Sequence, residues 1–348
     1  MMLEHPVGAR MGASIQACRT RLAETSPGFL VAVTIALAST FISDHYGGPT
    51  LLYALLFGMA LHFLSQDGRA VPGINFTARV VLRAGVALLG ARITAGQIAA
   101  LGWETVACVL AGVGSTILCG WLLARLLGIE RNFGLLSGGS VAICGASAAM
   151  ALSAAMPRGQ HGERNLILTV ALVTTLSTVA MILYPPVATA LGLTHAQAGV
   201  FLGATIHDVA QVVGAGYMIS VETGDTSTIV KLVRVALLAP VVMCFMIGFQ
   251  RRTGSGSGFR VPMPPGFLLA FLALVLVNSA GLMPAPVAHG LAEVSRWSLV
   301  AAIGALGVKT SMRELVAVGW RPVAVVVGET LFLAALILTA ILGLGVAG

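Results

Sequence analysis

Small polar residues gather in the stretch Ser137–Ser147, which holds three glycines and three serines in eleven residues. Close helix packing in a membrane is the purely structural interpretation of such a pattern. The functional interpretation is an interrupted helix whose backbone N–H groups and hydroxyls meet a substrate at mid-membrane, as helix N-termini bind anions. The candidate substrate-binding residues in this stretch are Gly139, Ser140, Cys144, Gly145 and Ser147.

A second polar group, formed by His207, Asp208 and Gln211, interrupts another apolar stretch. No other Asp, Glu, Lys or Arg lies between Leu166 and Ser220. An acid inside a membrane span costs about 2.5–3.5 kcal/mol, so it normally faces a partner or water. One interpretation is a polar lock inside a helix bundle. The other makes His207 and Asp208 a proton or cation site, with Gln211 beside a substrate.

Two basic residues, Lys231 and Arg234, lie three residues apart in an apolar run that ends near Pro240. Lys231 is close to the start of this run and can extend to the membrane surface. Arg234 is the better candidate for a buried cation, and its planar fork suits two oxygens of an oxyanion. Glu329 is a lone acid in the last apolar segment and a candidate counter-charge; Lys231 is kept as a further site candidate.

Enzyme signatures are missing from the sequence. It contains no HExxH, no P-loop, no GxGxxG between a strand and a helix, and no paired-carboxylate motif. The five cysteines show no metal-ligand spacing. We therefore expect no enzyme activity, no metal and no cofactor. An integral-membrane enzyme acting on a lipid-linked substrate stays open as the alternative from another class.

The chain that carries these residues is too apolar for a soluble protein. Of its 348 residues, 57% are hydrophobic and 9% are charged, whereas soluble proteins carry about 25% charged residues. The net charge of +7 does not indicate nucleic-acid binding, because most basic residues stand in short gaps between apolar runs. The composition predicts an integral membrane protein in a lipid bilayer.

Continuous apolar segments predict an all-α polytopic membrane protein with ten or eleven transmembrane helices, some of them broken. Residues 1–27 are more polar and predict a cytoplasmic amphipathic helix on the membrane surface. The apolar segments cover residues 28–44, 49–65, 74–93, 105–124, 133–156, 163–186, 196–220, 226–250, 264–283, 286–311 and 320–346.

The basic residues also predict an orientation. With the N-terminus inside, the inside gaps hold 13 basic residues and the outside gaps hold three, namely Arg92, Arg158 and Arg164. Because cytoplasmic loops are enriched in Arg and Lys, we expect a cytoplasmic N-terminus. Arg158 and Arg164 agree least well with this orientation. Both follow the glycine-rich segment 133–156, which raises the possibility that this segment does not cross completely.

An internal repeat joins two distant segments. Aligning Arg79–Trp103 with Arg296–Trp320 gives eight identities in 25 positions, including Arg79/Arg296 and Trp103/Trp320. The copies fall in segments an odd number apart, which predicts opposite orientations and hence an inverted repeat, as in secondary transporters. We therefore expect residues 28–348 to form one transmembrane transport domain, with approximate inverted halves 28–190 and 196–348.

Several motifs resemble a family of bacterial inner-membrane proteins named as sulfate exporters. They run in the same order from the third segment to the tenth and so cover most of the chain, and the cysteine and histidine motifs are the specific ones. They are Leu-Leu-Gly-Ala-Arg-Ile-Thr at 88–94, Gly-Ser-Val-Ala-Ile-Cys-Gly-Ala-Ser at 139–147, Ile-His-Asp-Val-Ala-Gln-Val-Val-Gly at 206–214, Leu-Val-Arg-Val-Ala-Leu-Leu-Ala-Pro at 232–240 and Ala-Ile-Gly-Ala-Leu-Gly-Val-Lys-Thr at 302–310.

This resemblance implies a carrier related to bile-acid/sodium symporters and sodium/proton antiporters. It departs from that superfamily in one respect, since crossing helices there recur five spans apart and the repeat here is seven apart. We expect a secondary transporter that exports a small inorganic or sulfonate-type anion, with H⁺ or Na⁺ coupling and a homo-oligomeric state left open. The alternative is a cation/proton antiporter that uses His207 and Asp208.

Overall fold

The computed structural model describes residues 6–66, 68–157, 162–253, 265–310 and 319–347. Every regular element in these ranges is a helix, which confirms the predicted all-α class. Within the described residues, seven helices are long and apolar enough to span a membrane, which agrees with a multi-pass membrane protein. Ten or eleven spans are not confirmed. The seven candidates are Leu22–Tyr46, Val71–Ala91, Gly102–Leu126, Gly162–Ala190, Val221–Phe249, Ala285–Lys309 and Trp320–Leu344.

The chain divides into two compact units. The first comprises residues Met1–Gly85 and Arg296–Lys309. It contains helices α1 to α3, the turns η1 and η2, the start of α4 and the second part of α15. Their bounds are α1 Pro6–Tyr46, α2 Thr50–Ala60, η1 His62–Ser65, α3 Val71–Phe76, η2 Thr77–Val81, α4 Leu82–Leu88 and α15 Ala285–Lys309.

Helices of the first unit approach each other through glycines. A Cβ atom on Gly28 of α1 or on Gly73 of α3 would collide with the backbone of the other helix. The same holds for Gly58 of α2 against Gly307 of α15. Missing side chains at such crossings let the two backbones pack directly, which is how helices associate in lipid.

The N-terminal helix is longer than the sequence predicts. Helix α1 runs without interruption from Pro6 to Tyr46, and its membrane-length stretch begins at Leu22 rather than at residue 28. Pro27 lies inside the helix. A proline removes one backbone hydrogen bond, and the long apolar run that follows outweighs this local loss. The surface location predicted for residues 1–27 stays a prediction, and residues 1–5 lie outside the described ranges.

The second unit comprises Val86–Ser295 and Thr310–Gly348 and contains all the candidate site residues. Three of its helices are long, and α12 is followed almost directly by α13. The bounds are η3 Leu89–Ala91, α5 Ala95–Ala100, α6 Gly102–Leu126, α7 Arg131–Ala142, α8 Ala146–Ala155, α9 Gly162–Ala190, α10 His195–Thr205, α11 Val209–Ile219, α12 Val221–Ala236, α13 Leu238–Thr253, α14 Gly266–Ser279 and α16 Trp320–Leu344.

Helices α7 and α8 form a hairpin that returns to the side on which it begins. A Cβ atom on Gly139 of α7 would meet Leu152 of α8. Near the start of α7, Asn132 lines the same cavity as Ser153 and Met156 at the end of α8. The first hairpin (α7–α8) therefore enters the unit and folds back, instead of continuing through it.

Helices α10 and α11 form a second hairpin of the same kind. The Oγ atom of Ser220, directly after α11, lies 3.1 Å from Nδ1 of His195, the first residue of α10. The two open ends of the second hairpin (α10–α11) therefore lie together. Its tip, like that of the first hairpin, is a break of three residues between two helices.

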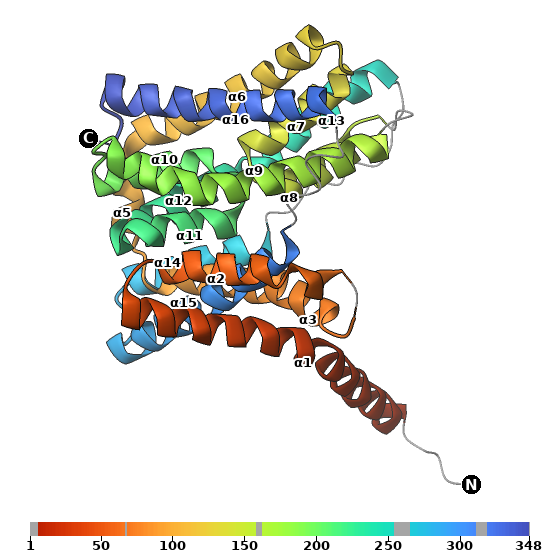
Figure 1. Ribbon diagram of the computed structural model, residues 1–348, viewed down its shortest axis with the longest axis vertical. Coiled ribbons are helices and arrows are strands. Elements are labelled where there is room, and N and C mark those ends of the chain that lie inside the picture. Colours follow the sequence, from red (N-terminus) through yellow and green to blue (C-terminus); the bar gives the residue numbers. More distant parts are fainter. Residues whose placement is uncertain (1–5, 67, 158–161, 254–264, 311–318, 348) are drawn as a thin grey trace. The chain divides into compact units, whose positions relative to one another are not determined.

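The 29-residue helix α9 connects the first hairpin to the second, so the two hairpins open at opposite ends of the unit (Figure 1). At 1.5 Å per residue, α7 with 12 residues reaches about 18 Å inward and α10 with 11 residues about 16 Å. Together these lengths match a hydrocarbon core of about 30 Å, so the tips can meet near its middle. Segments 133–156 and 196–220 are hairpins and not crossings.

The hairpin geometry makes a prediction for thiol accessibility. We expect Leu126→Cys and Glu163→Cys, placed before and after the first hairpin in a cysteine-free background, to respond alike to a membrane-impermeant thiol reagent on intact cells. With a cytoplasmic N-terminus, both should be protected. Leu191→Cys, at the far end of α9, should be labelled. All three native side chains are exposed. Labelling of Glu163→Cys without labelling of Leu126→Cys would mean that α7 and α8 cross completely.

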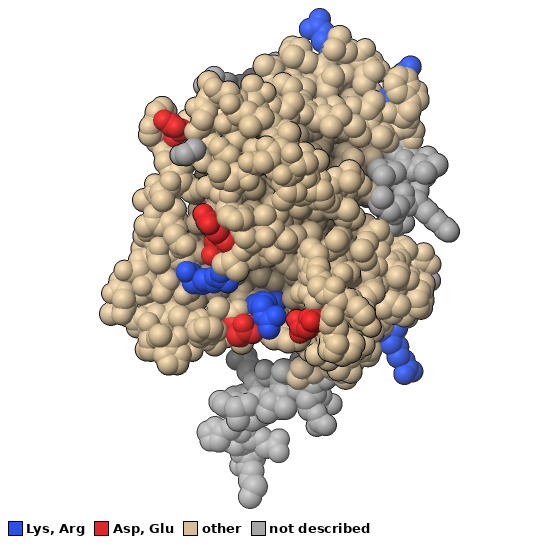
Figure 2. Space-filling model, turned by 60° about the vertical axis from the view of Figure 1, so that its left-hand side comes forward, with Lys and Arg blue, Asp and Glu red and all other residues tan. Residues whose placement is uncertain are grey.

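Charges are sparse on the surface as well. Figure 2 shows a face on which a few acidic and basic side chains interrupt a broad uncharged area. Large apolar side chains such as Leu118 and Leu331 are more than half exposed on long helices of the second unit. Such exposure agrees with a protein whose surroundings are lipid.

Candidate functional site at the hairpin tips

The first tip, residues 143–145, depends on a glycine. Gly145 has a φ of +63°, a conformation that other L-residues rarely adopt. Its N–H donates to the carbonyl of Ser140 at 2.8 Å and closes the turn. A Cβ atom on Gly145 would lie 3.5 Å from Cβ of His207, so the two tips touch.

The second tip, residues 206–208, ends in a helix cap. Oδ1 of Asp208 accepts a hydrogen bond from the N–H of Ala210 at 2.9 Å, which satisfies a free donor at the start of α11. The N–H of Asp208 donates to Oγ of Ser177 on α9 at 3.0 Å. These bonds fix the direction of the second tip and place a carboxyl group at the N-terminus of α11.

Lys231 links the two tips. Its Nζ atom donates to the carbonyl of Ile143 in the first tip and to that of Ile206 in the second, each at 2.8 Å. The side chain is completely buried. The interpretation in which Lys231 extends to the membrane surface is therefore wrong, because its ammonium group is held at the meeting point of the hairpins.

Arg234, one turn further along α12, uses every N–H group of its guanidinium on the same two helix ends. Its side chain is 1% exposed, which agrees with the buried cation predicted from the sequence. The acceptors are the carbonyls of Ala142 for Nε (2.9 Å), of Gly203 (3.0 Å) and Ile206 (3.1 Å) for Nη1, and of Val141 (2.8 Å) and Ala142 (2.7 Å) for Nη2.

These hydrogen bonds compensate the negative C-terminal ends of the two broken helices. The last carbonyls of α7 and α10 have no partner within their own helix, and each helix C-terminus carries about half a negative charge. Lys231 and Arg234 supply positive charge, and Arg234 donates to carbonyls in the last turn of each of the two helices. The same two residues therefore hold both interrupted helices together in the middle of the unit.

Helix α12 can hold both cations at this point because the second hairpin packs tightly against it. A Cβ atom on Gly203 of α10 or on Gly216 of α11 would collide with Ser227 of α12. Gly199 meets Thr226 in the same way. The small residues bring α10 and α11 against one face of α12, so Lys231 and Arg234 reach the tips without bending their helix.

The N-terminus of α8 differs from that of α11 because no side chain caps it. Gly145 occupies the cap position and offers no acceptor. Ser147, in the first turn of α8, is exposed, whereas Cys144 just before the cap is buried. With Asp208 at α11 and no acid at α8, the two cations, four helix ends and one carboxylate leave about one positive charge at the tips.

The other predicted site residues lie at different distances from the hairpin tips. His207 is buried, and its Nε2 atom lies 3.0 Å from Oγ1 of Thr330 on α16. Gln211 donates from Nε2 to Oγ1 of Thr178 at 2.8 Å, and its Oε1 has no hydrogen-bond partner among the described residues. His207 is thus part of the second tip, and Gln211 lies in the first turn of the helix that follows it.

Gly139, Ser140 and Glu329 are not at the tips. Gly139 packs on Leu152 inside the first hairpin, and the hydroxyl of Ser140 donates to the carbonyl of Leu136 in its own helix. Glu329 contacts Ser137, not Lys231: Oγ of Ser137 donates to Oε1 of Glu329 at 2.6 Å. The predicted pairing of Glu329 with a basic residue is therefore not what the structure shows.

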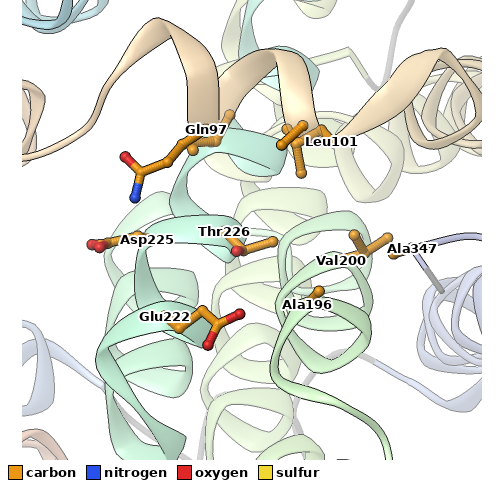
Figure 3. Close-up of a pocket in the computed structure, with 10 residues that line it drawn as sticks. Gln97, Leu101, Ala196, Val200, Glu222, Asp225, Thr226 and Ala347 are labelled. Atoms are coloured by element: carbon orange, nitrogen blue, oxygen red, sulfur yellow. The ribbon is translucent and has the colours of Figure 1, made fainter. Parts of the chain in front are cut away.

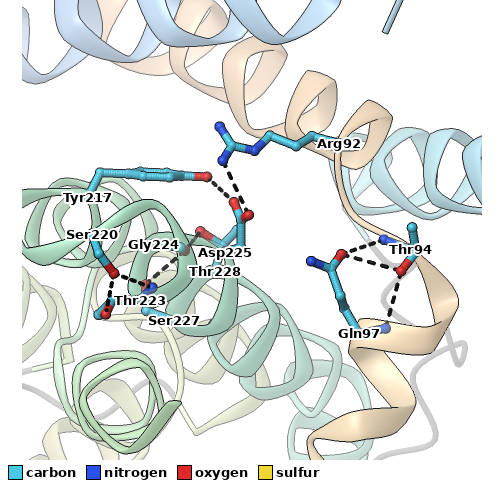
Figure 4. Close-up of polar contacts among 10 residues, drawn as sticks. All are labelled: Arg92, Thr94, Gln97, Tyr217, Ser220, Thr223, Gly224, Asp225, Ser227 and Thr228. Atoms are coloured by element: carbon cyan, nitrogen blue, oxygen red, sulfur yellow. Dashed lines mark hydrogen bonds and ion pairs between the residues drawn. The ribbon is translucent and has the colours of Figure 1, made fainter. Parts of the chain in front are cut away.

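A second polar cluster lies near the open end of the second hairpin (Figure 4). The hydroxyl of Tyr217 on α11 donates to Oδ1 of Asp225 on α12 at 2.5 Å. Nη2 of Arg92 forms an ion pair with Oδ2 of Asp225 at 3.4 Å, and its guanidinium carbon lies 5.8 Å from the centre of the Tyr217 ring. Asp225 thus ties α11 and α12 to the segment after η3.

The two bonds of Asp225 should differ in strength. The Arg92 side chain is 33% exposed, so its long ion pair is worth about 0.5 kcal/mol. The short bond from Tyr217 reaches a mostly buried carboxylate and is worth about 2 kcal/mol. We expect Tyr217→Phe to lower the unfolding temperature in detergent more than Arg92→Ala does. Arg83→Ala, at an exposed position, is the control. A larger loss for Arg92→Ala would contradict this ranking.

Cavities open beside both hairpins. One, of about 400 Å³, is lined by Gln97, Glu222, Asp225 and Thr226, together with residues of α10 (Figure 3). The other, of about 560 Å³, lies at the open end of the first hairpin and includes Glu130 and Asn165. The two cavities therefore belong to opposite hairpins, and residues 143–145 and 206–208 line neither of them.

Known proteins share this sequence over most of its length. The family described as Conserved hypothetical protein 698 matches residues 27–326. A UPF0324 membrane protein of Chlorobaculum tepidum is 52% identical over 326 residues, which cover 93% of this chain and 91% of the relative. The chain belongs to the UPF0324 membrane protein family. The UPF0324 membrane protein TauZ of Paracoccus pantotrophus is 54% identical over 319 residues, covering 91% of this chain and 94% of the relative.

Membership in the UPF0324 family agrees with the predicted membrane location. A further UPF0324 membrane protein, from Rhizobium meliloti, is 51% identical over 326 residues, 93% of this chain and 94% of that protein. These matches cover both hairpins and α12, so the tip residues lie within the shared region. The resemblance to sulfate exporters and the relationship to the symporter and antiporter superfamily stay predictions.

Some residues of this UPF0324 site were not predicted from the sequence. Thr330 and the hydroxyl residues of α9 bond directly to the second hairpin. A signal was present, since Thr174, Thr175, Ser177 and Thr178 are four hydroxyl residues within five positions of an apolar helix. Hydroxyls also bond to carbonyls of their own helix, and the sequence does not distinguish the two uses.

Proposed function

We propose that this protein is a secondary active transporter that exports a small anion across the bacterial inner membrane by alternating access. The substrate class is a sulfur oxyanion such as sulfate or sulfite, or a sulfonate. The observation that carries the proposal is the uncapped N-terminus of α8 beside two buried cations. It supplies N–H donors and about one unbalanced positive charge, which a dehydrated anion requires.

The arrangement of the hairpins supports alternating access. They open at opposite ends of the unit, as expected for inverted halves. Each has a cavity toward its own open end. The predicted repeat of residues 79–103 and 296–320, the halves 28–190 and 196–348, and a homo-oligomeric state remain parts of the proposal.

The predicted cytoplasmic N-terminus agrees better with two segments that fold back as hairpins than with eleven complete crossings. Nδ2 of Asn165 donates to Oε2 of Glu130 at 3.1 Å, so the start of α9 lies beside the start of α7. Arg164 therefore shares the side of Arg125 and Arg131, and it no longer opposes the positive-inside rule. Arg158 lies outside the described residues. In this orientation, the first hairpin opens to the cytoplasm.

A cation/proton antiporter is the second candidate. Asp208 favours it, because this acid lies at a tip, is only partly buried and caps the N-terminus of α11 with its carboxyl group. In the anion transporter, His207 and Asp208 would instead hold the H⁺ or Na⁺ that is coupled to anion movement. Both candidates are carriers and not enzymes.

Uptake into proteoliposomes separates these candidates. Vesicles with and without the purified protein should be given labelled sulfate, sulfite or sodium, in the presence and absence of a pH gradient. Protein-dependent uptake of sulfate or sulfite supports the anion transporter. Sodium uptake driven by a pH gradient, without anion uptake, supports the antiporter. Movement of neither class would leave both carrier proposals without support and favour the membrane-enzyme alternative.

A further inference from the structure

Glu329 is a completely buried acid in the middle of α16, away from the hairpin tips. Oε1 is 2.6 Å from Oγ of Ser137 on α7, and Oε2 has no hydrogen-bond partner among the described residues. Glycines of α6 and α7 enclose the carboxyl group: a Cβ atom on Gly120 would collide with Oε1 and with the backbone of Gly134. The space beside it is thus filled by backbone.

Nothing in the described residues balances a negative charge at this position. Among the residues that the structure describes, no Lys, Arg or His nitrogen forms an ion pair with Glu329. The titratable side chain that faces it from α6 is Cys119, and His207 reaches only the next residue, Thr330. The charged residues on the helices that pack against α16 stand at the outer ends of those helices. They are Glu104 and Arg125 on α6, Arg131 on α7, and Glu163 and Arg164 on α9.

An ionised carboxylate with one hydrogen bond and no counter-charge is unfavourable in such surroundings. A proton on Oε1 removes the charge without leaving a donor unused. The carboxyl O–H then donates to Oγ of Ser137, whose own O–H can turn to the carbonyl of Gly134, 3.4 Å away. The unpartnered Oε2 becomes a neutral carbonyl oxygen, which is much less costly to bury than a charged one.

We propose that Glu329 is a proton-binding site of the interface between α6, α7 and α16, and that it carries a proton at neutral pH. The site is separate from the tip residues His207 and Asp208. The site is nevertheless connected to both hairpins. Glu329 contacts the first hairpin through Ser137, and the adjacent Thr330 contacts the second hairpin through His207. Loss of the proton would place a charge between α7 and α16 and so weaken the packing of the first hairpin.

Infrared spectroscopy of the purified protein at neutral pH tests this site without any transport assay. We expect a C=O band of a protonated carboxylic acid, separate from the amide bands and sensitive to D₂O. Glu329→Gln should remove the band, because the amide absorbs with the backbone. Glu222→Gln, which neutralises an exposed acid of α12, is the matched control and should leave the band unchanged.

Ser137→Ala keeps the Glu329 carboxyl group but removes its hydrogen-bond partner, so the C=O band should shift to higher frequency. This variant also tests the proposal if Glu329→Gln does not fold. A spectrum without a protonated carboxyl band would overturn the proposal, as would a band that neither Glu329→Gln nor Ser137→Ala changes. Because the readout is the carboxyl group itself, these outcomes do not depend on whether the protein transports anions.

Discussion

Arg234→Ala is expected to abolish transport and to destabilise the protein by about 3–5 kcal/mol, the usual cost of removing one partner of a buried charged interaction. The guanidinium forms five hydrogen bonds to carbonyls of both hairpins. Its loss leaves the ends of α7 and α10 without donors in a buried place. Thermal unfolding in detergent and uptake into proteoliposomes measure the two effects.

Arg234→Lys distinguishes two roles of this residue. The sequence suggests that the guanidinium binds an oxyanion directly, and this stays a prediction. In the structure all five N–H groups are already used by backbone carbonyls, which favours a role in positioning the tips. If so, lysine, with three donors, should weaken sulfate or sulfite binding and stability together. Weaker binding at unchanged stability would instead support direct contact, and unchanged binding, with Ser140→Ala and Ser147→Ala also silent, would move the anion site elsewhere.

Asp208→Asn is expected to make transport insensitive to an imposed proton or sodium gradient while the protein remains folded. Asparagine is as good a helix cap as aspartate, so the bond to the N–H of Ala210 can persist. The charge of the carboxylate is lost, and with it a group that can hold a proton or a sodium ion beside the tips. Uptake with and without each gradient measures the effect.

Asp208→Ala provides the comparison for the cap. It removes both charge and cap and should lower stability by about 1 kcal/mol relative to Asp208→Asn. Full gradient-driven uptake by Asp208→Asn would identify Asp208 as a structural lock of the second tip. The coupling site would then have to be sought elsewhere in the unit.

The sequence locates the long helices well, because a membrane-length apolar run is a strong and local signal. It does not distinguish a hairpin from a crossing. Helices α7 and α8 together are as long and as apolar as one span, and contacts made in the fold, such as that between Gly139 and Leu152, show that they run back along each other. Arg164 carried the indirect signal, since a basic residue on the wrong side argues against a complete crossing.

The candidate site was predicted in its residue types but not in its contacts. Gly145, His207, Asp208, Lys231 and Arg234 do converge, although they come from three separate stretches of sequence. That the acceptors of Lys231 and Arg234 would be backbone carbonyls was not predictable, because every residue has a carbonyl group. Glu329 was a candidate counter-charge but contacts Ser137, since a lone acid in a sequence does not reveal which of several helices it faces.

The meeting of the two hairpin tips has a consequence for membrane voltage. The two cavities lie toward the open ends of opposite hairpins, so the tips and their two cations stand within the membrane electric field that falls between those ends. An anion that passes from one end to the other crosses the membrane voltage, which corresponds to about 2.3 kcal/mol per charge for each 100 mV. In a cell with a negative interior, this energy favours the proposed outward movement of a divalent anion, and export would be electrogenic when no coupled H⁺ or Na⁺ cancels the charge of the anion.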